Sequence, residues 1–483
     1  MESWAAAVLS PSLRLVQGAF GFGVHASVPI EPGTLLVRVP PALAVTAEGA
    51  LRVPSVASLV SRDTEAHVTL AVWLLYMRDS NSTHGTYSRA LADADIDCTL
   101  LWSEAELAYL QASRALAKAH VLRQWAAGEW QQILSRASSS AWPLVRPATQ
   151  SDFNWALCAI WSRSFQLACA DEDCGGAAGT SGGVWRVLAP GADLLNHDGT
   201  DPAAQLQVRA AGARPEQWEV STRGEVEETD EAAEDALVED AAALAHAAVS
   251  ASWSYAGGSD DESTDALILH ARRHIAPDSE VTLDYGARAN ADLLSTHGFA
   301  LEENAGEHTP LSLTLSPADQ LTPLKARLLA AGNVSAPYEL SARALQTDSP
   351  LLVALRIGAA NLAELAGDAY APAFMGKPLS RRNERRWRSM LRERVGYMLR
   401  EAEVESSADD DVALLQRLDD DVEMTQLGRR ARLRRRAALL TRLGEKRMLR
   451  QVLSTLDNMR GEKDGEGGGA ERDPVVASLA RDW

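Results

Sequence analysis

The chain has 483 residues, of which 46% are hydrophobic and 23% charged, as in an ordinary globular protein. This length exceeds what one hydrophobic core usually organises, so we expect two structural units. The net charge of −19 opposes nonspecific binding to nucleic acid and favours a basic protein partner. Because every long apolar stretch is interrupted by a charge before about 18 residues, we expect no membrane span.

The opening residues and the cysteines bear on the compartment. The first residues lack the basic start and the sustained apolar segment of a secretory signal. We therefore expect an intracellular protein of the cytoplasm or nucleus, with a plastid location only if the natural chain begins earlier. Since the cysteines at 98, 158, 169 and 174 form no CxxC pair, we interpret them as reduced packing residues and expect no metal.

The chain begins with short β-rich pieces and then becomes helical. Residues 18–45 alternate β-rich pieces with glycine and proline, which indicates a small β-unit. From about 62 to 165 apolar residues recur at helical spacing, as in HVTLAVWLLYM. Ser103 with Glu106, and Ser151 with Asp152 ahead of FNWALCAIWSRSF, are helix-start signatures. We therefore predict a helical insertion over 62–165.

Further along, low-complexity segments separate the β-type pieces. Residues 171–183 and about 211–265 have the composition of flexible insertions, the second containing the acidic run EVEETDEAAEDALVED. Helical patterning covers 306–460 and includes the basic segment RRARLRRRAALLTRLGEKRMLR, and 461–483 is predicted to be a flexible tail. We interpret the acidic run as a solvated insertion and the basic segment as a charged helix face, with docking surfaces as the alternative.

Three separated segments contain residue types suited to a ligand site. GFGV at 21–24 is a glycine turn that lets backbone approach a ligand, although such turns are usually only turns and no helix follows as in a phosphate loop. PGADLLNH at 190–197 places Asp193, Asn196 and His197 among leucines, where they must be paired, as a turn network or as a ligand site. Tyr285 at a strand end can present its hydroxyl to a cavity, but alone it would be a core tyrosine.

In their order, GFGV, WSRSF, PGADLLNH and DYGARANADLLSTHGF resemble the motifs of SET-domain protein methyltransferases, in particular the branch of the Rubisco large-subunit lysine methyltransferase. The resemblance runs over 14–300, and the helices of 306–460 resemble the substrate-binding domain of this branch. It implies an α+β fold: a β-rich SET fold with a knot-like crossing, split by the helical insertion and followed by an all-α C-terminal domain.

The resemblance also implies a cofactor and residue roles. The cofactor would be S-adenosyl-L-methionine, and Tyr285 would be the catalytic tyrosine. Asp193, Arg163 and His297 would line the substrate channel. Contacts to the cofactor would come from Phe20, Gly21, Phe22, Gly23, Arg163, Asn196, His197 and Tyr285. The loops carrying Asn196-His197 and Tyr285 must therefore meet at one pocket.

The implied activity is N-methylation of a lysine in a non-histone protein, through a basic segment, by a monomer that binds no nucleic acid. A lysine, with a reference pKa of about 10.4, must lose its proton first, and desolvation beside a sulfonium lowers that pKa. The protein then mainly holds donor and acceptor at reacting distance.

One departure from the branch leaves the acceptor open. His297 stands where a tyrosine is common, so protein-histidine methylation is an alternative, as is a purely structural histidine. A different class of function is a non-catalytic SET-like protein-binding module. Tyr285, Asn196, His197 and Arg163 argue against such a module, because a binding surface has no chemical need for all of them.

Overall fold

The computed structural model describes residues 8–18, 21–40, 42–137, 148–169, 184–209, 250–253, 266–346, 348–420 and 428–461. The chain divides into two compact units. The first unit comprises residues 1–107, 115–288 and 292–299, and the second comprises 108–114, 289–291 and 300–483. The predicted flexible insertion at 171–183, nearly all of the acidic one and the tail from 462 lie outside the described residues.

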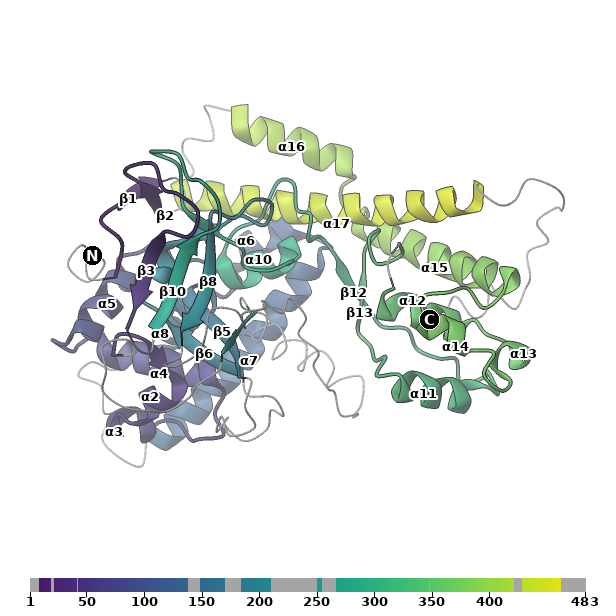
Figure 1. Cartoon of the computed structure of the whole chain (residues 1–483), viewed down its shortest axis with the longest axis horizontal. Helices are drawn as coiled ribbons and strands as arrows, with labels where there is room; N and C mark the ends of the chain where they lie inside the picture. The colour runs from purple at the N-terminus through teal and green to yellow at the C-terminus, as the bar shows by residue number, and fades with distance from the viewer. Residues whose placement is uncertain are drawn as a thin grey trace. The chain divides into compact units, whose positions relative to one another are not determined.

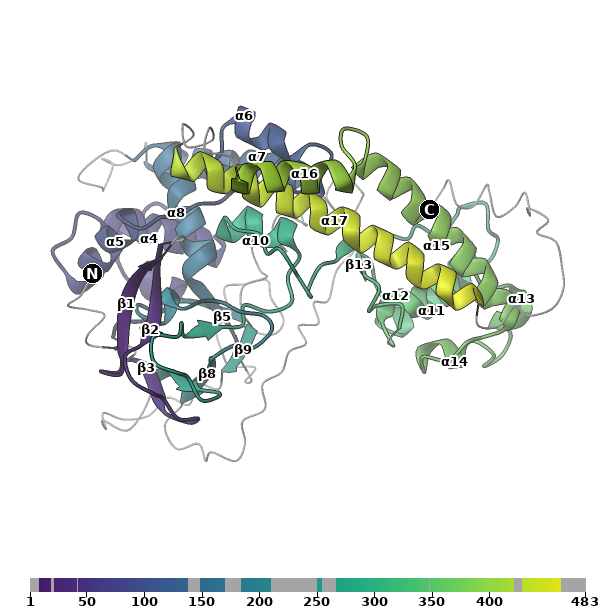
Figure 2. The ribbon, with the colours of Figure 1, turned by 90° about the horizontal axis from the view of Figure 1, so that it is seen from above.

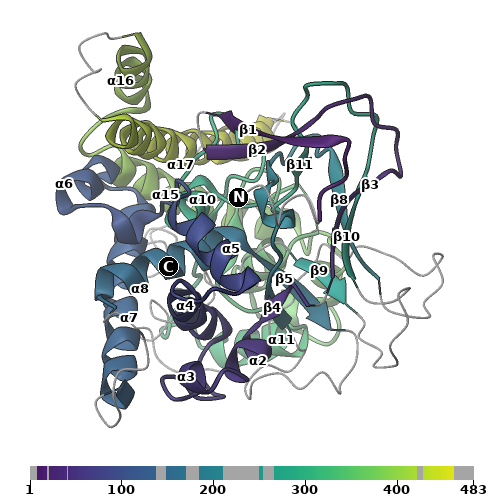
Figure 3. The same ribbon diagram turned by 90° about the vertical axis from the view of Figure 1, so that its left-hand side faces the viewer.

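The strands of the first unit form several small sheets (Figures 1 and 3). Antiparallel pairing joins β1 to β2, and β3–β10–β8 form a second antiparallel sheet. A third sheet has the order β4–β6–β5–β9, with β5 and β9 parallel, and β7 pairs with β11. The bounds are β1 (Leu13–Gly18), β2 (Gly21–Ala26), β3 (Leu35–Val39), β4 (Val45–Thr46), β5 (Ser164–Cys169), β6 (Val184–Leu188), β7 (Asn196–His197), β8 (Ala204–Arg209), β9 (Ser250–Trp253), β10 (Ala266–Ala271) and β11 (Thr282–Leu283).

Helices fill the predicted insertion between these strands. In α4 nine of twelve residues are buried, and the helix packs against α8, which explains its apolar sequence. Ser103 and Glu106 cap a helix as predicted, whereas α8 starts earlier than predicted, with a capping box of Thr149 and Asp152. The helices up to residue 300 are α2 (Ala47–Leu51), α3 (Pro54–Ala57), α4 (Ala66–Met77), α5 (Thr83–Ala92), η1 (Thr99–Leu101), α6 (Glu104–Leu107), η2 (Ala108–Leu110), α7 (Arg114–Ala137), α8 (Gln150–Arg163), η3 (Ala192–Leu194) and α10 (Asn290–His297).

A disulfide corrects the prediction of reduced cysteines for two of the four, Cys98 and Cys158. Cys98, which precedes η1, is bonded to Cys158 of α8 across 60 positions, and both residues are fully buried. The spacing of the two cysteines in the sequence gave no signal, because the helical insertion alone brings them together. The argument for an intracellular protein therefore loses the support of reduced cysteines.

The second unit has its own core around Leu355, Trp387 and Val452. Its helices α15 and α17 lie side by side, as Figure 2 shows. Ser349 caps α12, and Pro350 occupies its first turn, as helix-start preferences predict. The elements are β12 (Thr309–Leu311), α11 (Thr322–Ala331), β13 (Tyr338–Leu340), α12 (Pro350–Gly358), α13 (Leu362–Leu365), α14 (Ala371–Phe374), α15 (Arg381–Ala402), α16 (Ala408–Asp420) and α17 (Arg429–Gly461).

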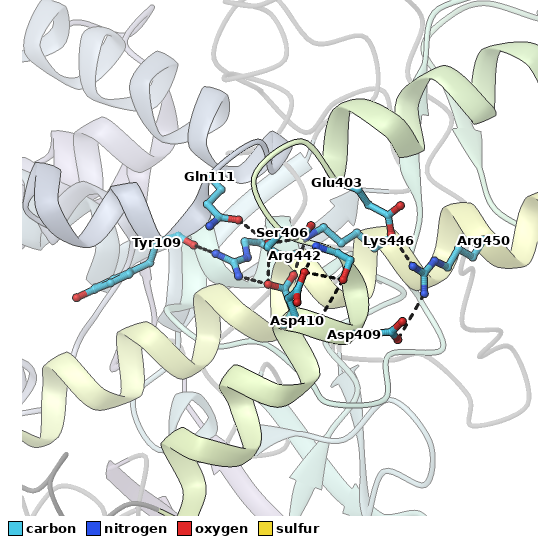
Figure 4. A network of polar contacts seen from close by, with 11 residues as sticks. Tyr109, Gln111, Glu403, Ser406, Asp409, Asp410, Arg442, Lys446 and Arg450 are labelled. Atoms are coloured by element: carbon cyan, nitrogen blue, oxygen red, sulfur yellow. Dashed lines mark hydrogen bonds and ion pairs between the residues drawn. The ribbon is translucent and has the colours of Figure 1, made fainter.

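A buried carboxylate joins α16 to α17. Asp411 is fully buried and bonds both Arg442 and Lys446, whose Nζ lies 2.7 Å from the Asp411 carboxylate. Arg442 also donates to the Tyr109 carbonyl at 2.8 Å, and Lys446 donates to the Ser406 carbonyl at 2.7 Å (Figure 4). The network ties η2, α16 and α17 together within the second unit.

The basic helix differs from the predicted solvated face. Arg436 pairs with Asp419 and Glu302, and Arg450 pairs with Glu403. Arg432 donates to the carbonyls at the end of α16. These surface ion pairs partly neutralise α17, and the Arg450 side chain stays 42% exposed, so the prediction of a solvated face holds there and is wrong for the buried Arg442 and Lys446.

Among the residues that the structure describes, no helix is long and apolar enough to cross a membrane. No group of three or more His, Cys, Asp or Glu side chains in the same ranges is arranged to hold a metal ion.

Replacing Asp411 by alanine should destabilise the second unit by roughly 3–5 kcal/mol, because two buried cations lose their anion. Hydrogen exchange in peptides from α16 and α17, together with urea denaturation, measures the effect. Asp409→Ala is the control, since the Asp409 side chain is 92% exposed and its pair with Arg450 is 3.9 Å long; it should change stability by less than about 1 kcal/mol. Equal exchange in the two variants would contradict the role of Asp411.

Candidate functional site

Two remote loops meet through a short parallel pairing. Thr282 and Leu283 of β11 pair with Asn196 and His197 of β7. The pairing places Tyr285, two residues beyond β11, against the His197 ring, with 5.0 Å between ring centroids and near-parallel planes. The prediction that these two loops lie together is confirmed.

Tyr285 is fixed at both its backbone and its hydroxyl. The hydroxyl donates to the Leu195 carbonyl at 2.6 Å, and the backbone N–H donates to Nδ1 of His197 at 3.1 Å. Burial raises the pKa of Tyr285 to about 12. The phenol is therefore neutral at physiological pH, and its oxygen keeps lone pairs with which to accept weak hydrogen bonds.

His197 is neutral, and its Nδ1 contacts two backbone groups of the other loop. Nδ1 accepts from the Tyr285 backbone N–H at 3.1 Å when it is unprotonated, and it lies 3.4 Å from the Leu283 carbonyl, so the shorter contact favours the tautomer with the hydrogen on Nε2. Burial lowers the pKa of His197, which favours the same uncharged form. The ring therefore holds the Tyr285 backbone as an acceptor.

The glycine turn reaches the same place through Asn196. The Asn196 amide donates to Glu280 at 2.6 Å. A Cβ added at Gly23 would lie 2.5 Å from Glu280 Oε1 and 3.1 Å from Asn196 Nδ2. The absence of a side chain at Gly23 therefore lets the turn approach the paired loops. Glu280 belongs to the third sequence segment, but nothing in that segment predicted a role for it.

Arg163 and Asp193 form a second group at the end of α8. Arg163 donates to the Asp193 backbone carbonyl at 2.6 Å. The Asp193 carboxylate is buried and accepts from the Tyr87 hydroxyl and the Gly191 backbone N–H, each at 2.8 Å. Burial raises the pKa of Asp193. The bonds from Tyr87 and Gly191 to this carboxylate thus fix the loop that Arg163 contacts, and the place of Asp193 in a substrate channel stays a prediction.

His297 lies on the other side of Tyr285, with 5.3 Å between ring centroids. The Thr296 hydroxyl has one hydrogen, which it donates to the Asp292 carbonyl at 2.8 Å. Nδ1 of His297, 2.7 Å from that hydroxyl oxygen, must therefore donate to it, which leaves Nε2 as the acceptor of the neutral ring. Burial, then the charge of Arg288, lowers the pKa of His297 well below its usual value.

Buried arginines surround these rings, and the sequence did not predict them as site residues. Arg186 and Arg288 are 4% and 8% exposed, and Arg288 donates to the Tyr285 carbonyl at 3.0 Å. Burial, then the neighbouring Arg288, lowers the pKa of Arg186 to about 9, and burial lowers that of Arg288 to about 10. Arg186, Arg288 and Arg163 all disfavour a positive charge on His297.

The first glycine of the turn opens onto a pocket. Gly21, whose φ is +102°, and Phe22 line it together with Arg163 and Leu194. Phe20, predicted as a cofactor contact, lies outside the described residues. The structure thus gathers the predicted residues Gly21, Phe22, Gly23, Arg163, Asp193, Asn196, His197, Tyr285 and His297 in the first unit.

Comparison with solved structures identifies the fold. "Crystal structure of the SET domain of LSMT bound to Lysine and AdoHcy" covers 99% of this chain and 96% of that chain, with a TM-score of 0.62 and 18% identity. The chain therefore has the fold of SET-domain methyltransferases of the Rubisco LSMT type, and the predicted α+β class is confirmed, although the mainly helical second unit also contains the β12–β13 pair and so is not all-α. Residues 316–449 match the family model described as Rubisco LSMT substrate-binding.

The curated relatives bear another name. Actin-histidine N-methyltransferase of Xenopus tropicalis is 23% identical over 83% of this chain, and that of Gallus gallus is 23% identical over 90%. The chain spans 60% and 64% of the lengths of these two relatives.

Replacing Gly23 by alanine should lower stability by about 1–2 kcal/mol, because the added Cβ would displace the Glu280 oxygen that accepts the bond from Asn196. Urea denaturation measures the loss. Gly128→Ala in α7 is the matched control: no atom lies within 4 Å of its added Cβ, so it should be neutral or stabilising by up to about 1 kcal/mol. Equal urea unfolding midpoints for Gly23→Ala and the native chain would show that the turn accommodates a side chain at this position and would contradict the close approach.

Proposed function

We propose that this chain is an S-adenosyl-L-methionine-dependent protein N-methyltransferase. The observation that carries the proposal is the parallel pairing of β7 with β11, which sets Tyr285 beside His197 and next to the glycine turn. Support comes from the solved SET-domain structure bound to lysine and AdoHcy, the demethylated form of this cofactor.

The residues present fit such a cofactor. Gly21 lines the pocket and leaves backbone accessible to a ligand, whereas the missing side chain at the buried Gly23 lets Asn196 and Glu280 pack against the turn. Arg163 lines the pocket beside the turn. When bound, the cofactor supplies a methyl group on a sulfonium, an electrophile that requires no acid catalyst.

The protein's own residues then orient the reacting groups. The Tyr285 hydroxyl, anchored on the Leu195 carbonyl, has a pKa of about 12 and stays un-ionised, so it directs a neutral oxygen rather than an anion at the reacting centre. A neutral oxygen accepts CH···O contacts from a polarised methyl group without forming a competing nucleophile. The stacked His197 ring holds the Tyr285 ring in place.

The acceptor is lysine or histidine. Lysine follows from the resemblance to the Rubisco branch, and the lysine-bound solved structure supports it. Two observations favour histidine. Arg288, Arg163 and Arg186 all lower the pKa of His297, so an incoming ammonium would meet like charge from these groups, whereas an imidazole is already neutral near pH 7. The curated relatives are named actin-histidine N-methyltransferases.

The remaining partner predictions rest on charge. The net charge of −19 supports a basic segment in the protein substrate. A monomeric state, the absence of nucleic-acid binding and an intracellular location stay predictions.

Tyr285→Phe should bind the cofactor as the native protein does, yet transfer methyl groups about 10²-fold or more slowly, because the oriented hydroxyl is lost. Calorimetry measures cofactor binding, and labelled methyl transfer to candidate proteins measures turnover. Tyr76→Phe is the control, a partly buried tyrosine of α4 in the same unit. Equal transfer by Tyr285→Phe and Tyr76→Phe would remove Tyr285 from the mechanism, and no binding by the native chain would favour the non-catalytic module.

The pH dependence of methyl transfer identifies the acceptor when two peptides are compared, one with histidine and one with lysine at the same position. With histidine, kcat/KM should rise through about pH 6.5 and then level off; with lysine it should keep rising toward about pH 10. His297 adds no step near neutrality, because its pKa lies well below its usual value. Amino-acid analysis of the product identifies methylhistidine or methyllysine, and a methyllysine product with no methylhistidine would refute the histidine acceptor.

A further inference from the structure

One face of α15, in the second unit, carries positive charge that the fold does not neutralise. The helix begins with RRNERR, and Arg381, Arg382 and Arg385 are exposed. Residues 381 and 385 are about one helical turn apart and 382 lies beside them, so the three side chains share one side of the helix. Within the part of the chain that the structure describes, none of the three forms an ion pair. We call these three residues the arginine face.

The acidic residue of the same turn is occupied elsewhere. Glu384 is 8% exposed and lies on the buried side of α15. Its carboxylate accepts from Arg356 at 2.8 Å and from Arg388 at 3.2 Å. Since two other arginines share this negative charge, Glu384 does not neutralise the arginine face.

The arginine face opposes the stability of its own helix. The first turn of a helix lies at the positive end of the helix dipole and favours acidic residues, and like charges one turn apart repel each other. The neighbouring α16 follows this preference, with Asp409, Asp410 and Asp411 in its first turn. An arrangement that disfavours the folded helix and has no compensating contact inside the fold indicates a role in binding.

A comparison with α17 separates this face from a merely arginine-rich sequence. The first turns of α17 are also rich in arginine, but those side chains are engaged within the second unit. Arg432 donates to carbonyls at the end of α16, Arg435 lies 5.2 Å from the centre of the Tyr109 ring, and Arg436 pairs with Asp419. The arginine face of α15, which Figure 2 shows beside α17, stays available to a partner outside the chain.

We propose that the arginine face of α15 binds an acidic segment of a partner protein. Carboxylates match guanidinium groups in geometry as well as in charge. The inference goes beyond the proposed function, because binding such a segment requires no methyl transfer. It also differs from the basic partner expected from the net charge, since salt screens charges more than about 8 Å away and the three arginines dominate their own surroundings.

The same face suits nucleic acid poorly. It extends over only about one turn of helix, so a longer polyanion would leave it and meet a chain whose net charge is −19. The aromatic residue of this stretch, Trp387, is 1% exposed and therefore offers no surface on which a base could stack.

Fluorescence anisotropy at about 0.15 M salt tests the proposal with labelled deca-glutamate and labelled decathymidylate as probes of the full chain. The triple variant Arg381→Gln, Arg382→Gln, Arg385→Gln should weaken deca-glutamate binding about tenfold, because each exposed ion pair contributes roughly twofold. Its urea unfolding midpoint should equal or exceed that of the native chain, because the substitutions relieve repulsion at the start of α15.

The matched control is the triple variant Arg392→Gln, Arg436→Gln, Arg450→Gln. It removes the same charge from the same unit, but each of these arginines already has a carboxylate partner. Deca-glutamate affinity should therefore change by less than about twofold.

Three results would overturn the inference. Equal weakening by the two triple variants would mean that the peptide responds only to net charge. No binding of deca-glutamate by the native chain, or a lower unfolding midpoint for the arginine-face variant, would show that these arginines serve no acidic ligand or serve the fold instead. Tighter binding of decathymidylate than of deca-glutamate, lost in the arginine-face variant, would replace the acidic segment by nucleic acid.

Discussion

The pairing of β7 with β11 is the contact on which the site depends. Each strand is two residues long, so the backbone bonds alone give little stability, and side chains must complete the junction. Tyr285 supplies two of these bonds, to the His197 ring and to the Leu195 carbonyl. The same tyrosine therefore fastens the two loops and presents its hydroxyl, which explains how a site assembled from remote segments keeps a defined geometry.

Short motifs were enough to predict which segments meet. The glycine turn, the Asn196-His197 pair and Tyr285 each had an ordinary structural explanation, and only their joint order pointed to one site. The structure supports that prediction through contacts that each motif makes with another, as when Gly23 lies against Asn196. A position where the fold has no room for a side chain can be recognised in the sequence, because it must be occupied by glycine.

Other features depend on contacts between distant segments, and the sequence alone did not predict them. Arg186 belongs to a strand and Arg288 follows the tyrosine, and neither position stands out until burial brings both near His297. The disulfide between Cys98 and Cys158 spans 60 positions without a recognisable spacing. The basic pattern of α17 was visible, but its carboxylate partners, Asp411 above all, come from a different helix. Sequence patterns predict periodicity well and long-range charge pairing poorly.

Burial has a common effect on the ionisable groups of the site. It raises the pKa of Tyr285 and Asp193 and lowers that of His197 and His297, so each is driven toward its neutral form. The arginines keep their charge, because even the lowered pKa values of about 9 and 10 lie above physiological pH. The arginines that act on His297 all disfavour a positive charge on it, the carboxylates of Asp193 and Glu280 act on the neighbouring Tyr285, and the rings are neutral. On the proposed function, an acceptor that arrives uncharged would avoid repulsion from these arginines, whereas an ammonium would first have to give up its proton, so the electrostatics of the site would favour a neutral acceptor side chain.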